Sequence, residues 1–215
     1  MGNQDFSEDF RYLEFLKNKK APALFNDLYD TLRKGTHIQK QSHEELFDFI
    51  EIEGNEESIS DFIRLFNETQ MLNRRGQQHE KYYFIDFIEG SKGNTDRKYI
   101  ENDELLVGFL IYKVFILDFN YDLSISFFQN AILQNYENYK QGIIKNLGKT
   151  AKTTSSTSGD EIIIDTIRKA FNCFDRICWL RLDPDKDGFT FYPAFQRIID
   201  VYSHKINTID TWLIE

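Results

Sequence analysis

The most constraining feature of this sequence is a unit that occurs twice, in which an amphipathic helix leads into a polar turn and an aromatic strand. The first copy spans residues 57–87 and the second spans residues 161–192. In each copy apolar residues recur at helical spacing, and a charged turn then precedes a short aromatic run. A helix that leads directly into a charged hairpin is the sequence form of a winged helix. Two copies predict a mainly α protein with small β-hairpins, organised as tandem winged-helix domains.

The chain has 215 residues, which is enough for two small domains. The Gly-containing polar run GSKGNT has no periodicity and separates the two copies, so we place a linker there. The expected organisation is an N-terminal arm at 1–20, a first winged-helix domain at 21–90, a linker at 91–96, a second winged-helix domain at 97–205 and a C-terminal tail at 206–215.

In the first domain the predicted order is helix, strand, helix, helix and hairpin. Pro22 suits the first turn of the first helix, and Gly35 ends that helix. Ser42 is predicted to cap the second helix, with Glu45 three residues later completing a capping box. The apolar stripe of the third helix continues to Leu72, where the predicted hairpin of residues 72–87 begins.

The second domain repeats the pattern with longer helices. Ser124 or Ser126 is predicted to cap its second helix. The polar run TAKTTSSTSG at residues 150–159 is predicted to be a mobile loop. The remaining expected elements are a first helix at 102–118, wing strands at 179–182 and 189–192, and a last helix at 194–205.

Charge limits the possible partners, because the chain has a formal net charge of −9. A protein this acidic should not bind DNA over its whole surface, so any phosphate contact must be a local patch. Basic side chains follow the first predicted helix and gather on the first predicted wing. We identify these as a candidate DNA-binding patch, with ordinary solvated charges as the alternative interpretation: Arg33, Lys34, Lys40, Arg74, Arg75 and Lys81.

A sequence-specific regulator would read base edges with basic or amide side chains on its recognition helix. The third predicted helix of the first domain instead carries four acidic residues against the single cation Arg64: Glu56, Glu57, Asp61 and Glu68. Phosphate groups would repel such a helix. The sequence therefore favours a structural or binding subunit over a regulator.

No complete catalytic or metal site is visible in the sequence. Residues 183–188 match the first half of an EF-hand loop, but Ala194 stands where the bidentate glutamate should be, so a hairpin turn is the better interpretation. Cys173 and Cys178 lie on a predicted helix at a spacing that is poor for a disulfide, and we expect buried thiols in a reducing cytoplasm. The four histidines lack metal-ligand spacing. We expect no enzymatic activity, no cofactor and no metal.

The sequence also argues against a membrane partner. Its most apolar run, residues 105–119, contains Lys113 and is too short to cross a bilayer. The first ten residues are acidic and polar, unlike a signal peptide. We therefore expect a cytoplasmic protein.

Three stretches carry a resemblance to one family. They are FNDLYDTLRKGTHI, similar to the family's N-terminal helix and strand, ENDELLVGFLIYKVF, similar to the first helix of its second domain, and IRKAFNCFDRICWLRLDPDKDGFTFYPAFQRI, similar to its final helix, wing and ending. Over residues 23–198 the chain resembles MukE/MksE, the kite (tandem winged-helix) subunit of bacterial SMC condensin complexes, including their Wadjet-type relatives.

This resemblance implies a non-enzymatic homodimer that binds the kleisin subunit and, through the kleisin, an SMC ATPase. It implies a nucleoid-associated role in chromosome organisation and segregation, or in defence against plasmids, with non-specific DNA binding in support. A winged-helix transcription regulator is the alternative. Neighbouring genes for a kleisin and a large SMC ATPase would favour the first interpretation.

Overall fold

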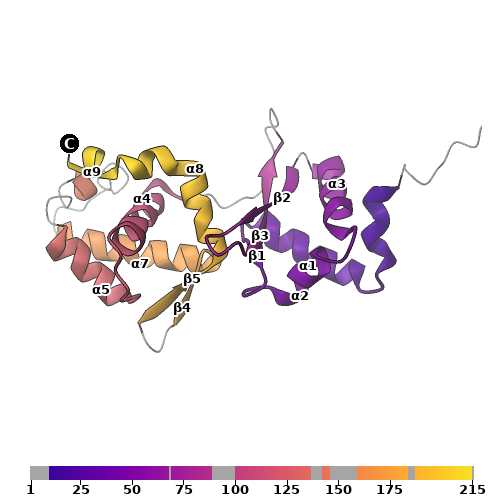
Figure 1. Ribbon diagram of the computed structural model, residues 1–215, viewed down its shortest axis with the longest axis horizontal. Coiled ribbons are helices and arrows are strands. Elements are labelled where there is room, and N and C mark those ends of the chain that lie inside the picture. The colour runs from indigo at the N-terminus through magenta and orange to yellow at the C-terminus, as the bar shows by residue number, and fades with distance from the viewer. Residues whose placement is uncertain are drawn as a thin grey trace, which may run out of the picture. The chain divides into compact units, whose positions relative to one another are not determined.

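A computed structural model describes residues 10–67, 69–88, 100–136, 142–145, 159–183 and 187–214. These residues are mostly helical, with two small antiparallel sheets, as the sequence predicts (Figure 1). The chain divides into two compact units, Met1–Lys98 and Tyr99–Glu215. The predicted linker at 91–96 and residues 150–158 of the predicted mobile loop lie outside the described residues.

The first unit has the predicted order of helix, strand, helix, helix and hairpin, preceded by a short 3₁₀ helix. Its elements are η1 (Arg11–Lys17), α1 (Ala21–Arg33), β1 (Ile38–Gln39), α2 (Glu44–Ile50), α3 (Asn55–Asn67), β2 (Thr69–Arg75) and β3 (Lys81–Phe87). β3 is the central strand of the sheet, with β1 and β2 paired antiparallel on its two sides. β2 and β3 form the wing hairpin. The sequence predicts this order of elements for a winged helix.

One apolar core holds the helices of the first unit against one face of its sheet. Tyr83 and Ile85, at alternate positions of β3, belong to this core because side chains alternate between the two faces of a strand. Phe15 of η1 is 1% exposed, and its ring centroid lies 4.9 Å from that of Phe25 and 5.6 Å from that of Phe62. η1 falls inside the segment that we expected to form an N-terminal arm, and it contributes a ring to the centre of the unit.

One predicted helix cap in the first unit is wrong. α2 begins at Glu44, and the residue at its N-cap position, His43, makes no side-chain cap hydrogen bond. Ser42, the predicted cap, lies in the turn after β1, where its backbone N–H and its hydroxyl both donate to the carbonyl of Gln39. The hydroxyl of Ser42 is used in this turn and does not cap α2, so the capping box with Glu45 does not form.

In the second unit the described residues form helices that precede a hairpin, and two of these helices change to π-helical geometry. α4 (Asn102–Ile111) continues as η2 (Tyr112–Leu117), and α5 (Ile125–Asn130) continues as η3 (Ala131–Asn135). Ser124, one of the two predicted caps, accepts a backbone hydrogen bond at the start of α5. The other elements are α7 (Gly159–Arg176), β4 (Leu180–Asp183), β5 (Gly188–Phe191), η4 (Pro193–Phe195), α8 (Gln196–Asn207) and α9 (Ile209–Ile214).

Aromatic rings fill the core of the second unit between its helices and its hairpin. β4 and β5 pair antiparallel, as the sequence predicts. The ring centroid of Phe189 lies 5.0 Å from that of Phe171 and 5.2 Å from that of Phe115. Gly188 forms an isolated β-bridge with Ser124, so the residue that caps α5 also meets the wing. The second wing is thereby joined to the helices on which it lies.

The two cysteines do not share a helix, contrary to the sequence prediction. Cys173 is buried in α7, whereas Cys178 lies beyond the end of that helix with a φ of 59°. Both are free thiols, as expected, but only Cys173 is buried, whereas Cys178 is partly exposed. The chain leaves the helix at this point because it must turn sharply into β4.

A nearly buried lysine of the second unit is held by carboxylates. Lys113 is 8% exposed, and its Nζ lies 2.9 Å from Asp210 of α9 and 3.6 Å from Asp118. A buried charge without partners is costly, so these carboxylates stabilise the position of Lys113. α9, which falls inside the predicted C-terminal tail, therefore contributes to the packing of the second unit.

Gly108 lies where α4 packs closely on α7 and α8. A Cβ there would lie 2.5 Å from Ile198 Cδ1 and 3.2 Å from Phe174 Cζ. We predict that Gly108→Ala lowers the free energy of unfolding by about 1–2 kcal/mol, because overpacking outweighs the gain in helix propensity. Urea unfolding measures the change. Gly188→Ala is the matched control, since the nearest atom to its Cβ would be 3.8 Å away, and an equal loss in both variants would contradict the prediction.

Candidate functional site

A polar cluster joins the first wing to the helices beneath it. Lys81 of β3 pairs with Glu56 of α3 at 2.6 Å and with Glu51 at 2.9 Å. The hydroxyl of Tyr83 hydrogen-bonds with Glu56 at 2.9 Å and with Glu51. Asn73 of β2, the register partner of Tyr83, also donates to Glu56. The cluster therefore connects both wing strands to the end of α2 and the start of α3.

The cluster shifts the protonation equilibria of its members. Burial raises the pKa of Tyr83, and hydrogen bonds to the two carboxylates raise it further, so the phenol stays neutral. Burial alone would raise the pKa of Glu51, but hydrogen bonds from Tyr83 and Lys81 lower it below its ordinary value. Burial alone would lower the pKa of Lys81, but hydrogen bonds to Glu56 and Glu51 raise it above its ordinary value. Lys81 and Glu51 are thus held in their charged forms at neutral pH.

Lys81 is consequently the least available of the six predicted DNA contacts. Its side chain is 22% exposed, and its ammonium group lies 4.9 Å from the centroid of the Tyr83 ring. A phosphate group would have to compete with two carboxylates and a ring face for this one cation.

Sheet register brings three of the predicted cations to the same end of the first sheet. Arg75 lies opposite Lys81, and Lys40 directly follows β1, the neighbour of β3 on its other side. Arg74 precedes Arg75 on β2, but side chains alternate along a strand, so the two leave opposite faces. Arg74 and Arg75 donate to backbone carbonyls at 3.3 and 3.1 Å respectively.

The other predicted cations make ion pairs at exposed positions. Arg33 and Lys34, at the end of α1, pair with Asp30 at 3.5 and 3.4 Å. Lys40 pairs with Asp48 at 3.6 Å. Exposed pairs of this kind contribute little stability and are screened by salt, so these cations keep access to an anionic partner.

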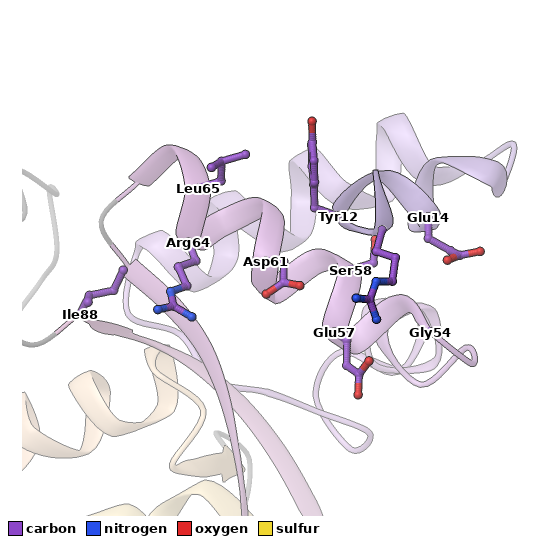
Figure 2. A pocket seen from close by; sticks show the side chains of 10 residues that line it. Tyr12, Glu14, Gly54, Glu57, Ser58, Asp61, Arg64, Leu65 and Ile88 are labelled. Carbon is purple, nitrogen blue, oxygen red and sulfur yellow. The ribbon is translucent and has the colours of Figure 1, made fainter. Parts of the chain in front are cut away.

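A groove of about 700 Å³ lies between η1 and α3. Figure 2 shows Ile88 and Arg64 at one end of the groove, Glu14 at the other end, and Asp61 between them. Glu57 and Asp61 are both exposed and lie four residues apart on α3, so they share one face of the helix. The sequence predicts this acidic helix face but gives no sign of the groove, because η1 is distant from α3 in the sequence.

α3 takes the place of a recognition helix in the first unit, but its outward face is unsuited to DNA. Carboxylates on that face would repel the phosphates that a recognition helix must approach. The cations that keep access to an anionic partner lie on the wing, directly after β1 and at the end of α1 instead.

An exposed aromatic loop in the second unit is absent from the candidate sites predicted from sequence. Phe119 is 70% exposed and Tyr121 is 87% exposed. Phe119 has a φ of 54°, and the side chain of Asn120 donates to the carbonyl of Val114 at 2.7 Å. Apolar side chains held in solvent mark interaction surfaces when they cluster. The sequence signal that could have identified this loop is the pair of aromatic residues, Phe119 and Tyr121, around the predicted turn at Asn120.

Comparison with known families decides the identity of the chain. A family model described as condensin complex protein MksE matches residues 23–203. The chain belongs to the MksE family. A search of curated proteins found no match. MksE proteins are non-catalytic accessory subunits of condensin, so family membership confirms that the chain is not an enzyme and makes SMC-complex subunits its partners.

Within the described ranges of this MksE-family chain, no helix is both long and apolar enough to cross a membrane. No cluster of three His, Cys, Asp or Glu side chains in the same ranges is placed to hold a metal ion. Residues 184–186 of the half EF-hand lie outside those ranges, and the residues on either side form the predicted hairpin.

The carboxyl of Glu51 should make the stability of the first unit depend on pH. Its pKa is lower in the fold than the ordinary value of 4.5. The stability that it contributes is therefore present above about pH 4.5 and is lost as the pH falls through the folded pKa. We predict that Glu51→Gln reduces this acid loss and lowers the free energy of unfolding at neutral pH by up to about 1 kcal/mol, since solvent screens the half-exposed pair.

Urea unfolding from about pH 7 to pH 3 measures this dependence. Glu44→Gln, on the exposed face of α2, is the control and should leave the pH profile unchanged. Identical acid profiles for the wild-type and Glu51→Gln proteins would refute the role given to Glu51.

Proposed function

We propose that this chain is the kite subunit of an SMC condensin-like complex, in which it forms a homodimer and binds the kleisin. It acts beside the SMC ATPase in the cytoplasm, associated with the nucleoid, in chromosome organisation and segregation or in plasmid defence. The observation that carries this proposal is the family match, which extends over helices and wings of both units.

Exposed apolar side chains support a role in assembly. In the first unit Leu65 is 60% exposed and Phe66 is 63% exposed. In the second unit the aromatic loop presents Phe119 and Tyr121, and the hydrogen bond from Asn120 holds the loop in shape. A loop that is already ordered loses little conformational entropy on binding, which favours its use as a contact.

The proposed DNA contact is a non-specific one at the first wing. The main proposed contacts are Arg74 and Arg75, whose hydrogen bonds to backbone carbonyls can be replaced by bonds to phosphate. Additional contacts come from the three cations whose ion pairs are exposed and can likewise be replaced: Arg33, Lys34 and Lys40. Lys81 contributes least, since it is held between Glu51 and Glu56. The alternative, a sequence-specific regulator, would need a basic outward face on α3, and that face is acidic.

The first prediction from this proposal concerns assembly. Light scattering of the purified protein should give twice the chain mass of 25.6 kDa, because kite subunits of this kind act as dimers. The tagged chain should also co-purify with the kleisin encoded beside it. A stable monomer that fails to co-purify with the kleisin would overturn the proposal.

The second prediction concerns DNA. About five phosphate contacts should make affinity fall by roughly two to three decades between 50 and 200 mM salt. Arg74→Glu/Arg75→Glu should weaken binding to two unrelated duplexes about equally and reduce the salt slope by about two, because phosphate contacts carry no sequence information. Fluorescence anisotropy with a salt titration measures both effects.

The matched control for this titration is Lys19→Glu/Lys20→Glu, which makes the same charge change at two other exposed neighbours. It should retain most of the wild-type affinity. A strong preference for one duplex, or unchanged binding by the Arg74→Glu/Arg75→Glu variant, would instead favour base reading by the recognition helices and the regulator alternative.

A further inference from the structure

The groove between η1 and α3 has the chemistry of a docking site for a peptide segment. Its volume of about 700 Å³ can accept several side chains. It is lined by charged groups along α3 and by the apolar side chains of Leu65 and Ile88 at one end (Figure 2). Polar and apolar groups that converge in one concave surface are typical of a recognition site.

Two carboxylates of the groove are available to a basic partner. Three carboxylates and two guanidinium groups line the groove. Among the residues that the structure describes, Glu57 and Asp61 have no hydrogen-bond or ion-pair partner, whereas Glu14 pairs with Lys17. Two exposed carboxylates on one helix face are therefore free to bind a lysine or arginine from another chain.

The apolar end of the groove selects for a hydrophobic neighbour of that basic residue. Leu65 is 60% exposed, although it is a large aliphatic side chain at the end of α3. Ile88 is half-buried and lies at the same end of the groove (Figure 2). A leucine-sized side chain bound there would remove apolar surface of both residues from water, which favours association.

We propose that this groove binds a short kleisin segment that carries a basic side chain beside an apolar one. The inference rests on the proposed function, because it takes the kleisin as the partner, and adds the surface and the chemistry of the contact. The wing remains outside the groove, so a kleisin held there leaves Arg74 and Arg75 accessible to DNA.

The experiment measures the affinity of the intact chain for the full-length kleisin from the same gene cluster, by anisotropy of the labelled kleisin. Glu57→Lys/Asp61→Lys should weaken binding at least tenfold, because it replaces the two free carboxylates with cations. Leu65→Ala should weaken it less, by a few-fold. Circular dichroism and thermal unfolding check that each variant is folded.

Two controls match these changes at exposed positions outside the groove. Asp27→Lys/Glu44→Lys reverses the charge of two exposed carboxylates on α1 and α2, and Val201→Ala shortens an aliphatic side chain that is 56% exposed. Both controls should keep kleisin affinity within about twofold of the wild type, as expected for surface changes away from an interface.

The outcomes separate this inference from the function on which it rests. Wild-type affinity in a folded Glu57→Lys/Asp61→Lys variant would overturn the groove assignment and leave the proposed function intact. Loss of self-association with unchanged kleisin affinity would overturn it too, and would make the groove a contact between copies of this chain. Absence of kleisin binding by the wild-type protein would overturn the proposed function and the groove assignment together.

Discussion

The first unit depends on Tyr83, because one side chain serves both its apolar core and its wing. The residue is 0% exposed and belongs to the core under the sheet, while its hydroxyl reaches Glu51 and Glu56. It also stands on β3, the central strand, between Ile38 of β1 and Asn73 of β2. Packing, sheet order and the polar cluster therefore meet at one residue. Without these partners the buried hydroxyl would lose, on folding, the hydrogen bonds that it makes with water in the unfolded chain. The stability of the first unit would then be lower.

Sequence periodicity predicted the elements better than it predicted their ends. Both hairpins form where aromatic runs follow charged turns, because a turn and an alternating strand are local properties of the chain. Leu72 fits the helical spacing of α3 and was assigned to its stripe, yet it lies on β2 opposite Phe84. The first pair of β2 is Thr69 with Phe87, so pairing to β3 begins three residues before the predicted start of the hairpin. Pairing with a distant strand decided that boundary, and a single window of sequence does not contain it.

The candidate sites, like the elements, could be predicted from the sequence only in part. The basic residues of the wing are visible in the sequence, but the commitment of Lys81 to Glu51 and Glu56 depends on three segments that meet only in the fold. The acidic face of α3 is likewise visible, whereas the groove requires η1 to pack beside it. Charge type can therefore be predicted from composition along an element. Its availability to a partner depends on which neighbours the tertiary structure supplies.

The ion pair between Lys113 and Asp210 has a practical consequence for work with this protein. Asp210 lies on α9, close to the C-terminal end of the chain, and Lys113 is nearly buried in the second unit. Proteolysis or truncation after α8 would remove that carboxylate and leave the ammonium group with less compensating charge. Limited digestion that trims α9 can therefore be followed as a loss of heat resistance.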